Sequence, residues 1–124
     1  MKAILIDPFE KEVREIDWSG NYHDISNILD APHFDVAHFG SGDGDVIYVD
    51  DEGLFREKGQ EYFGFAGHPN PLAGYGLLVG TDAEGNTVAP QISLDWAATK
   101  TFFLGDMGGN PPRPQITVVP WGDD

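Results

Sequence analysis

Short apolar runs separated by turn-forming residues limit the folds that this chain can adopt. The runs are rich in β-branched and aromatic residues and are bounded by Gly, Pro, Asn or Asp, a pattern typical of strands joined by turns. They occupy residues 2–7, 12–16, 34–39, 46–50, 61–67, 75–81, 87–92 and 101–105. Residues 22–30 and 93–101 favour short helices instead, with Ser19 or Asn21 expected to cap the first and Ser93 the second. The pattern predicts an α+β fold in which a mostly antiparallel sheet carries two short helices in a single domain.

The composition changes near residue 106. Residues 1–105 are expected to form one compact domain, a length at which a chain can bury an ordinary core. Residues 106–115 hold three prolines and two glycines and predict a linker, and residues 116–121 predict a last strand or a loose tail. The chain has no cysteine, and its first apolar run is too short for a signal peptide. We therefore expect a cytoplasmic protein that does not enter a membrane.

The net charge is −14, from 21 acidic and 7 basic residues. Direct nucleic-acid binding is not expected, because it needs clustered Lys and Arg. Three explanations of the charge remain open: solubility, adaptation to high salt, and an acidic face that takes the place of nucleic-acid phosphates on a partner. Residues 32–52 carry six acids and no Lys or Arg, which favours a local patch. The residues predicted to bind a partner are Asp43, Asp45, Asp50, Asp51 and Glu52.

The acidic and histidine residues do not form a recognisable metal motif. Asp50, Asp51 and Glu52 could serve a hard cation or a general acid, but three acids before a glycine are more typical of a solvated turn. Asp43 and Asp45 lack the remainder of a calcium loop, and none of the four histidines forms a zinc pair. We predict no metal site and no cofactor.

The stretch GHPNPLAGYG, residues 67–76, is either a rigid connection between two strands or a loop that holds a ligand. Its prolines stiffen the backbone, and its glycines allow a ligand to approach the peptide groups closely. Aromatic side chains nearby could stack on a nucleobase, with the few cations contacting phosphates. The residues predicted to bind a nucleotide in this alternative are Arg56, His68, Asn70, Gly74, Tyr75 and Trp96.

Three segments, VIYVDDEGLF, GHPNPLAGYGLLVGTDAEGN and PQISLDWA, resemble a family of small uncharacterised proteins encoded by bacteriophages, plasmids and other mobile elements of bacteria. The resemblance covers most of residues 1–100 and does not extend to the segment after residue 106. It implies a mobile-element setting, and hence the cytoplasm of a bacterial host, but no activity. Short acidic proteins in such a setting often bind and block a host component. This link between setting and role is an association and gives no mechanism.

The sequence favours a non-enzymatic binding protein over an enzyme. It contains no G-x-S-x-G, no cysteine nucleophile, no dinucleotide-binding fingerprint and no GxxxxGK[ST]. We expect the protein to inhibit or sequester a host factor, such as a nucleic-acid-binding or defence protein, in evasion of host defence. A small-molecule sponge for a nucleotide signal, and an atypical enzyme with a carboxylate or histidine site, remain as alternatives.

Overall fold

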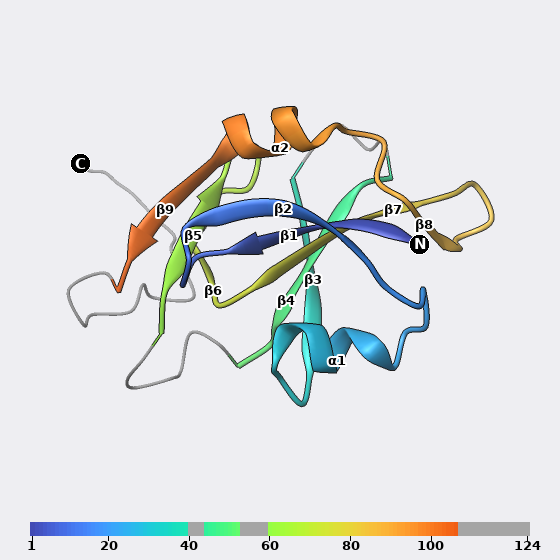
Figure 1. Cartoon of the computed structure of the whole chain (residues 1–124), viewed down its shortest axis with the longest axis horizontal. Helices are drawn as coiled ribbons and strands as arrows, with labels where there is room; N and C mark the ends of the chain where they lie inside the picture. The colour runs from blue at the N-terminus through green and yellow to red at the C-terminus, as the bar shows by residue number, and fades with distance from the viewer. Residues whose placement is uncertain (40–43, 53–59, 107–124) are drawn as a thin grey trace, which may run out of the picture.

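The computed structural model describes residues 1–39, 44–52 and 60–106 (Figure 1). Three of the sequence-based predictions lie outside these residues. They concern Asp43, Arg56 and the segment after residue 106.

The larger sheet has the strand order β2-β1-β7-β4-β3, and β8 pairs with the far end of β7. Every neighbouring pair is antiparallel. The strands of this sheet are β1 (Lys2–Asp7), β2 (Glu12–Asp17), β3 (Phe34–His38), β4 (Val46–Asp50), β7 (Gly76–Thr81) and β8 (Thr87–Val88). The mostly antiparallel sheet expected from the sequence is therefore confirmed.

A second, smaller sheet has the order β6-β5-β9, again antiparallel. Its strands are β5 (Tyr62–Phe65), β6 (Leu72–Ala73) and β9 (Thr101–Gly105). The helices are α1 (Asp24–Leu29) and α2 (Leu94–Lys100), and they lie on opposite sides of the molecule in Figure 1. The two helices predicted from the sequence are both present.

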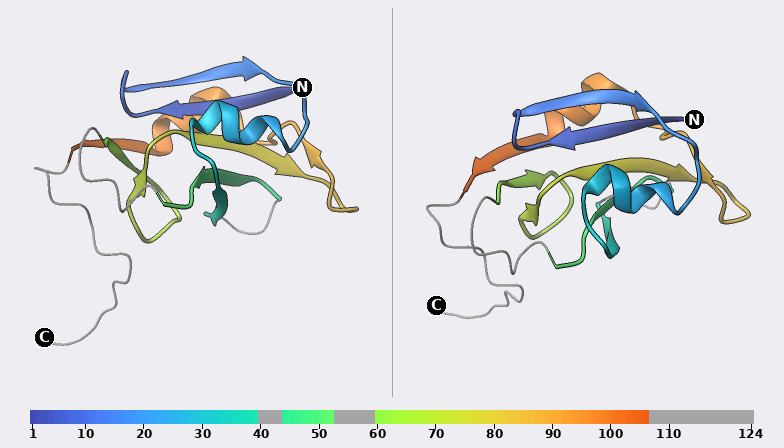
Figure 2. Two further views of the ribbon diagram at one scale, coloured as in Figure 1. Left: turned by 90° about the horizontal axis from the view of Figure 1, so that it is seen from below. Right: turned by 60° about the horizontal axis from the view of Figure 1, so that its bottom comes forward.

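The larger sheet is covered on both faces. One face packs against the small sheet and α2, through side chains that include Ile4, Phe63 and Ala97. The other face packs against α1, through side chains that include Leu77 and Ile25. In both views of Figure 2, α1 lies over β7 and the strands of the small sheet lie to the left. Burial on both faces explains why β1 and β7 are almost continuously apolar rather than alternating.

The stretch 67–76 carries the chain from the small sheet to the larger one. It includes β6, which pairs back onto β5 before the chain turns at Gly74 into β7. Gly74 has a φ of 78°, and its N–H donates to the carbonyl of Glu61 at 2.8 Å. Further on, a Cβ on Gly76 would lie 2.7 Å from the Phe63 ring, so this glycine lets the two sheets approach closely. The crossover expected from the sequence is present, although β6 itself was not predicted.

The ends of the elements differ from the predictions at two places. Neither Ser19 nor Asn21 caps α1 directly: the N-cap position is His23, and Asn21 instead accepts the His23 N–H at 3.0 Å in a turn before the helix. Residues 87–92 were predicted as one strand, but β8 ends at Val88 because Pro90 and the residues after it lead into α2. Ser93 caps α2 as expected and accepts the Trp96 N–H at 3.1 Å.

Candidate functional site

Two adjoining cavities lie where β4 ends, and Asp50 lines both of them. The first cavity has a volume of about 160 Å³ and the second of about 220 Å³. Besides Asp50, the first cavity is lined by Phe9, Leu29, Asp30, Gln60, Gly74 and Tyr75. The second is lined by the polar residues Asp35, Asp51 and His68. Its apolar lining consists of Val36, Ala37, Val49, Pro71, Leu72 and Ala73.

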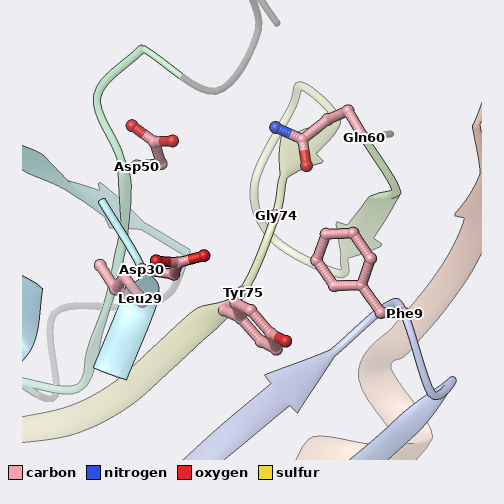
Figure 3. A pocket seen from close by; sticks show the side chains of 7 residues that line it. All are labelled: Phe9, Leu29, Asp30, Asp50, Gln60, Gly74 and Tyr75. Carbon is pink, nitrogen blue, oxygen red and sulfur yellow. The ribbon is translucent and has the colours of Figure 1, made fainter. Parts of the chain in front are cut away.

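Aromatic rings and carboxylates face each other across the first cavity. Figure 3 shows Asp30 and Asp50 on one side, the Phe9 ring on the other, and the Tyr75 ring below them. The Phe9 and Tyr75 rings are tilted by 45°, with 5.0 Å between their centroids. Tilted rings at this separation are a favourable aromatic pair, so the two side chains support each other's position.

The turn between β1 and β2 places Phe9. Asp7 is only 2% exposed, and its carboxylate accepts the Phe9 N–H at 3.0 Å and the Glu10 N–H at 3.1 Å. Arg14 donates to the same carboxylate at 3.0 Å and also contacts Glu12. The buried carboxylate is therefore satisfied within the turn and holds the backbone of Phe9 at the cavity.

The end of α1 places Asp30. This residue adopts the left-handed conformation with a φ of 55°, and its N–H donates to the Asn27 carbonyl at 3.3 Å. Aspartate and asparagine tolerate this conformation better than most residues other than glycine. Within the described part of the chain, the Asp30 carboxylate has no hydrogen bond or ion pair, and this exposed residue lines the cavity.

Carboxylate charges act on the phenol of Tyr75 in the first cavity. Burial is the largest cause that raises the pKa of the Tyr75 phenol, and the charges of Asp7, Asp30 and Glu10 raise it further. Arg14 acts in the opposite direction, but it is already paired with Asp7. Burial opposes any charge in the cavity, whereas the carboxylate charges that act on the phenol would attract a cation.

The second cavity contains a histidine of fixed orientation. The Nδ1 atom of His68 lies 2.8 Å from the carbonyl oxygen of His38. Because a carbonyl oxygen only accepts, Nδ1 carries the proton in this contact and Nε2 is the acceptor in the neutral ring. The contact fastens the crossover to β3.

The predicted acidic patch is divided by the length of β4. Asp50 is the last residue of the strand, and Asp51 and Glu52 follow it. Asp45 precedes the other end, roughly 16 Å from Asp50 at 3.3 Å per residue. The Asp50 Oδ1 atom accepts the Glu52 N–H at 2.9 Å, which is the bond expected of an acidic turn. Asp45 instead accepts backbone N–H groups of Gln91 and Ile92. Asp45 thus has a structural role in a different part of the molecule.

The residues predicted to bind a nucleotide are also separated. Gly74 and Tyr75 line the first cavity, and His68 lines the second. Asn70 lines neither of these two cavities. Trp96 lies on α2, where the Lys100 ammonium is 5.1 Å from the centroid of its ring.

The lining of the first cavity bears on the kind of ligand it could accept. Its described lining offers two carboxylates and no Lys or Arg, which does not suit a phosphate. The nucleotide alternative stays a prediction.

Four polar or aromatic residues of the two cavities were not predicted: Phe9, Asp30, Asp35 and Gln60. Each comes from a different segment of the chain, so no local motif marked them. The turn DPFE carries an aromatic residue directly after its proline, and the half-buried Phe9 ring packs on Tyr75 in the structure.

The described residues hold no group of three or more His, Asp or Glu side chains placed to bind a metal ion. In the same residues, no helix is long and apolar enough to cross a membrane.

Residues 1–100 match the family described as a domain of unknown function (DUF3846), and the chain belongs to that family. No curated protein and no solved structure matches the chain.

Proposed function

We propose that this protein is a non-enzymatic binding protein that captures a basic partner at its acidic end. The acidic end is the surface around the two cavities that carries Asp30, Asp35, Asp50 and Asp51. The observation that supports this function is the position of Asp50, which gives two adjoining cavities a common acidic wall. A partner with two neighbouring basic side chains could place one in each cavity.

The charge of the whole chain supports the same function. A net charge of −14 attracts cationic partners over distance, and hollows lined by one sign of charge concentrate the field. In the mobile-element setting implied by the sequence resemblance, the partner would be a host protein that normally binds nucleic acid. The carboxylates would contact the residues with which the host protein binds phosphates. The protein would thereby inhibit or sequester that host factor in evasion of host defence.

The cavities themselves favour binding over catalysis. The first cavity offers carboxylates, an amide and a phenol, and none of these forms a nucleophile paired with a base. In the second cavity, His68 Nε2 is a potential base, but the described lining residues include no hydroxyl or thiol nucleophile beside it. An enzyme would have to activate water there, and that alternative predicts loss of turnover in a His68→Gln variant without loss of partner binding.

The first experiment compares basic and neutral peptides of equal length by isothermal titration calorimetry. We expect the basic peptides to bind, with an affinity that falls as salt rises. The variant Asp50→Asn/Asp51→Asn should weaken binding by about tenfold, equivalent to about 1.4 kcal/mol. The control Glu84→Gln/Asp95→Asn removes the same charge from the β7–β8 loop and α2. If the control weakens binding equally, or if no basic peptide binds, the acidic end is not the binding surface.

A second experiment tests mimicry directly. Labelled DNA bound to a basic DNA-binding domain of a bacterial host is titrated with the protein, and release is followed by fluorescence anisotropy. Release by the wild type and by the Glu84→Gln/Asp95→Asn control, but not by Asp50→Asn/Asp51→Asn, is the expected result. Equal release by all three would mean that bulk charge alone competes with DNA.

A further inference from the structure

We infer that the first cavity binds an alkylammonium group, held between the Phe9 and Tyr75 rings and the carboxylates of Asp30 and Asp50. This inference rests on the proposed function and specifies the chemistry that the acidic end recognises. A lysine side chain of a partner protein and a free aliphatic amine present the same group. The chemistry is common to both sources, and the experiment below separates them.

The aromatic pair supplies one side of such a site. A cation is attracted to the face of an aromatic ring when it lies within about 6 Å of the ring centroid. The Phe9 and Tyr75 centroids are 5.0 Å apart and their planes are tilted by 45°, so a small cation beside the pair can approach both rings. The methylene groups that carry an ammonium would contact the Phe9 ring, which faces the carboxylates in Figure 3.

The carboxylates supply the opposite side. The Asp50 Oδ1 atom is engaged with the Glu52 N–H at 2.9 Å, but a carboxylate has further acceptor capacity on Oδ2. Asp30 has both oxygens available within the described residues. An ammonium has three N–H donors and no acceptor, so two carboxylates and a pair of rings match its requirements.

Asp30 reaches this cavity with a backbone conformation that is energetically unfavourable for most residues other than glycine. Its φ of 55° is uncommon for a residue other than glycine, and this end of α1 has no glycine. An outlier of this kind in the wall of a cavity is a reason to suspect a functional role for the side chain. Arg14, which also influences Tyr75, is engaged by Asp7 and Glu12 and so does not neutralise Asp30.

The ligands of the cavity favour an ammonium over other cations. A metal ion is not favoured, because no described group of three carboxylate or histidine side chains converges here. A guanidinium is a larger planar group that binds best to paired acceptors lying in its own plane. An ammonium instead has three diverging N–H donors, which suit carboxylates that reach the cavity from two separate segments, the end of α1 and the end of β4.

The test is a titration of the full chain, followed by NMR of its aromatic side chains and backbone amides. The probes are the capped pentapeptide Gly-Gly-Lys-Gly-Gly, its Arg counterpart and butylamine. The expected result is saturable shifts at Phe9, Tyr75, Asp30 and Asp50 with the Lys peptide, and at least fivefold weaker binding of the Arg peptide. Absence of shifts at the two rings, or equal affinity for the Arg peptide, overturns the inference.

Variants separate this inference from the proposed function. Phe9→Leu and Asp30→Asn should each weaken the Lys peptide about tenfold, whereas Tyr75→Phe keeps the ring and should retain binding. The affinity of long basic peptides could fall in Asp50→Asn/Asp51→Asn but stay unchanged in Phe9→Leu and Asp30→Asn. In that case the proposed function stands and the alkylammonium site does not. If no basic probe binds at all, both fail.

The comparison between peptide and butylamine identifies the source of the ammonium group. Binding of the Lys peptide at least tenfold tighter than butylamine assigns the cavity to a lysine of a protein partner. Equal affinity assigns it to a free amine.

Discussion

Asp45 and Gln91 are 46 positions apart in the chain, yet the Gln91 N–H lies 3.0 Å from both carboxylate oxygens of Asp45. The next N–H, that of Ile92, donates to the same carboxylate at 3.0 Å. Ile92 in turn packs against the core between the two sheets. One side chain before β4 therefore anchors the segment that leads into α2.

Replacing Asp45 by alanine should destabilise the fold. The change leaves two backbone N–H groups without their acceptor, which costs roughly 1–3 kcal/mol for buried groups and less where water can reach them. We expect a loss of about 1–2 kcal/mol in the free energy of unfolding, measured by urea denaturation. Asp45→Asn keeps one acceptor oxygen and should lose less. The exposed Glu84→Ala control should stay within about 0.5 kcal/mol of wild type, and an equal effect at both sites would contradict the anchoring role.

A second prediction compares two glycines of positive φ. Gly67, at the start of the crossover, has a φ of 99°, and Gly85, in the β7–β8 loop, has a φ of 87°. A Cβ on Gly67 would lie 2.1 Å from the Phe39 carbonyl oxygen, whereas a Cβ on Gly85 would meet nothing within 4 Å. Both alanine variants carry backbone strain of about 1–2 kcal/mol.

Only Gly67→Ala adds a clash with backbone, which should cost a further 1–3 kcal/mol or so. Thermal unfolding followed by circular dichroism will measure both variants under the same conditions. Equal melting temperatures for the two would show that the chain near Phe39 moves aside easily, so that the crossover is less tightly fixed than the structure indicates.

Most of the fold followed from local patterns in the sequence. The strands β1, β4 and β7 were predictable because burial on both faces produces unbroken apolar runs, and α2 because Ser93 precedes it. β6 was not, because it is two residues long and its pairing with β5 is a tertiary contact inside a stretch rich in Gly and Pro. The division into two sheets likewise depends on long-range packing.

The candidate site was predictable only in part. Asp50, Asp51, Gly74 and Tyr75 come from conspicuous local motifs, and the structure brings them to adjoining cavities. Asp30 and Phe9 reach the first cavity from a helix end and from the β1–β2 turn, and no spacing in the chain relates these segments to β4. Charge density along the sequence also grouped Asp45 with Asp50, although an extended strand carries its two ends far apart.

A third prediction concerns the phenol of Tyr75. Because the Asp30 charge helps to raise the Tyr75 pKa, Asp30→Asn should lower that pKa, although burial and the charges of Asp7 and Glu10 keep it above the usual value near 10. The Cζ chemical shift of Tyr75, followed by ¹³C NMR through a pH titration, measures the change. Glu84→Gln removes a carboxylate from the β7–β8 loop and should leave the Tyr75 pKa unchanged. An unchanged value in Asp30→Asn would mean that Asp30 does not face the phenol.

The same shift has a consequence for stability at high pH. A raised pKa means that the folded state keeps the phenol proton to a higher pH than the unfolded state does. The free energy of unfolding is therefore unaffected below about pH 10 and falls as pH rises above it, by at most about 1.4 kcal/mol per pH unit for each proton. Tyr48 and Tyr62 have pKa values raised mainly by burial and should contribute to the same decline. Tyr75→Phe should make the decline shallower, and an identical slope would contradict the assignment.

The last prediction concerns the stability cost of the acidic end. Asp50 and Asp51 are adjacent carboxylates without an ion pair among the described residues, so their repulsion should destabilise the fold at low ionic strength. Asp50→Asn/Asp51→Asn keeps the acceptor oxygen for the Glu52 N–H and should raise the free energy of unfolding by roughly 0.5–1 kcal/mol in low salt. The gain should largely disappear in 1 M NaCl, where the Debye length is about 3 Å.

Asp82 is the matched control, because its carboxylate accepts the N–H groups of Glu84 and Asn86. These bonds lower the pKa of Asp82, with the Asn86 backbone N–H as the largest cause. The charged form therefore contributes stability above the unfolded pKa, and that stability is lost as pH falls through the folded value. Asp82→Asn should accordingly destabilise the protein at neutral pH, opposite in sign to Asp50→Asn/Asp51→Asn. If Asp82→Asn and Asp50→Asn/Asp51→Asn raise the free energy of unfolding equally, the negative charge destabilises the fold uniformly over the surface. The acidic end would then lack a stability cost of its own, which a functional site that trades stability for binding should show.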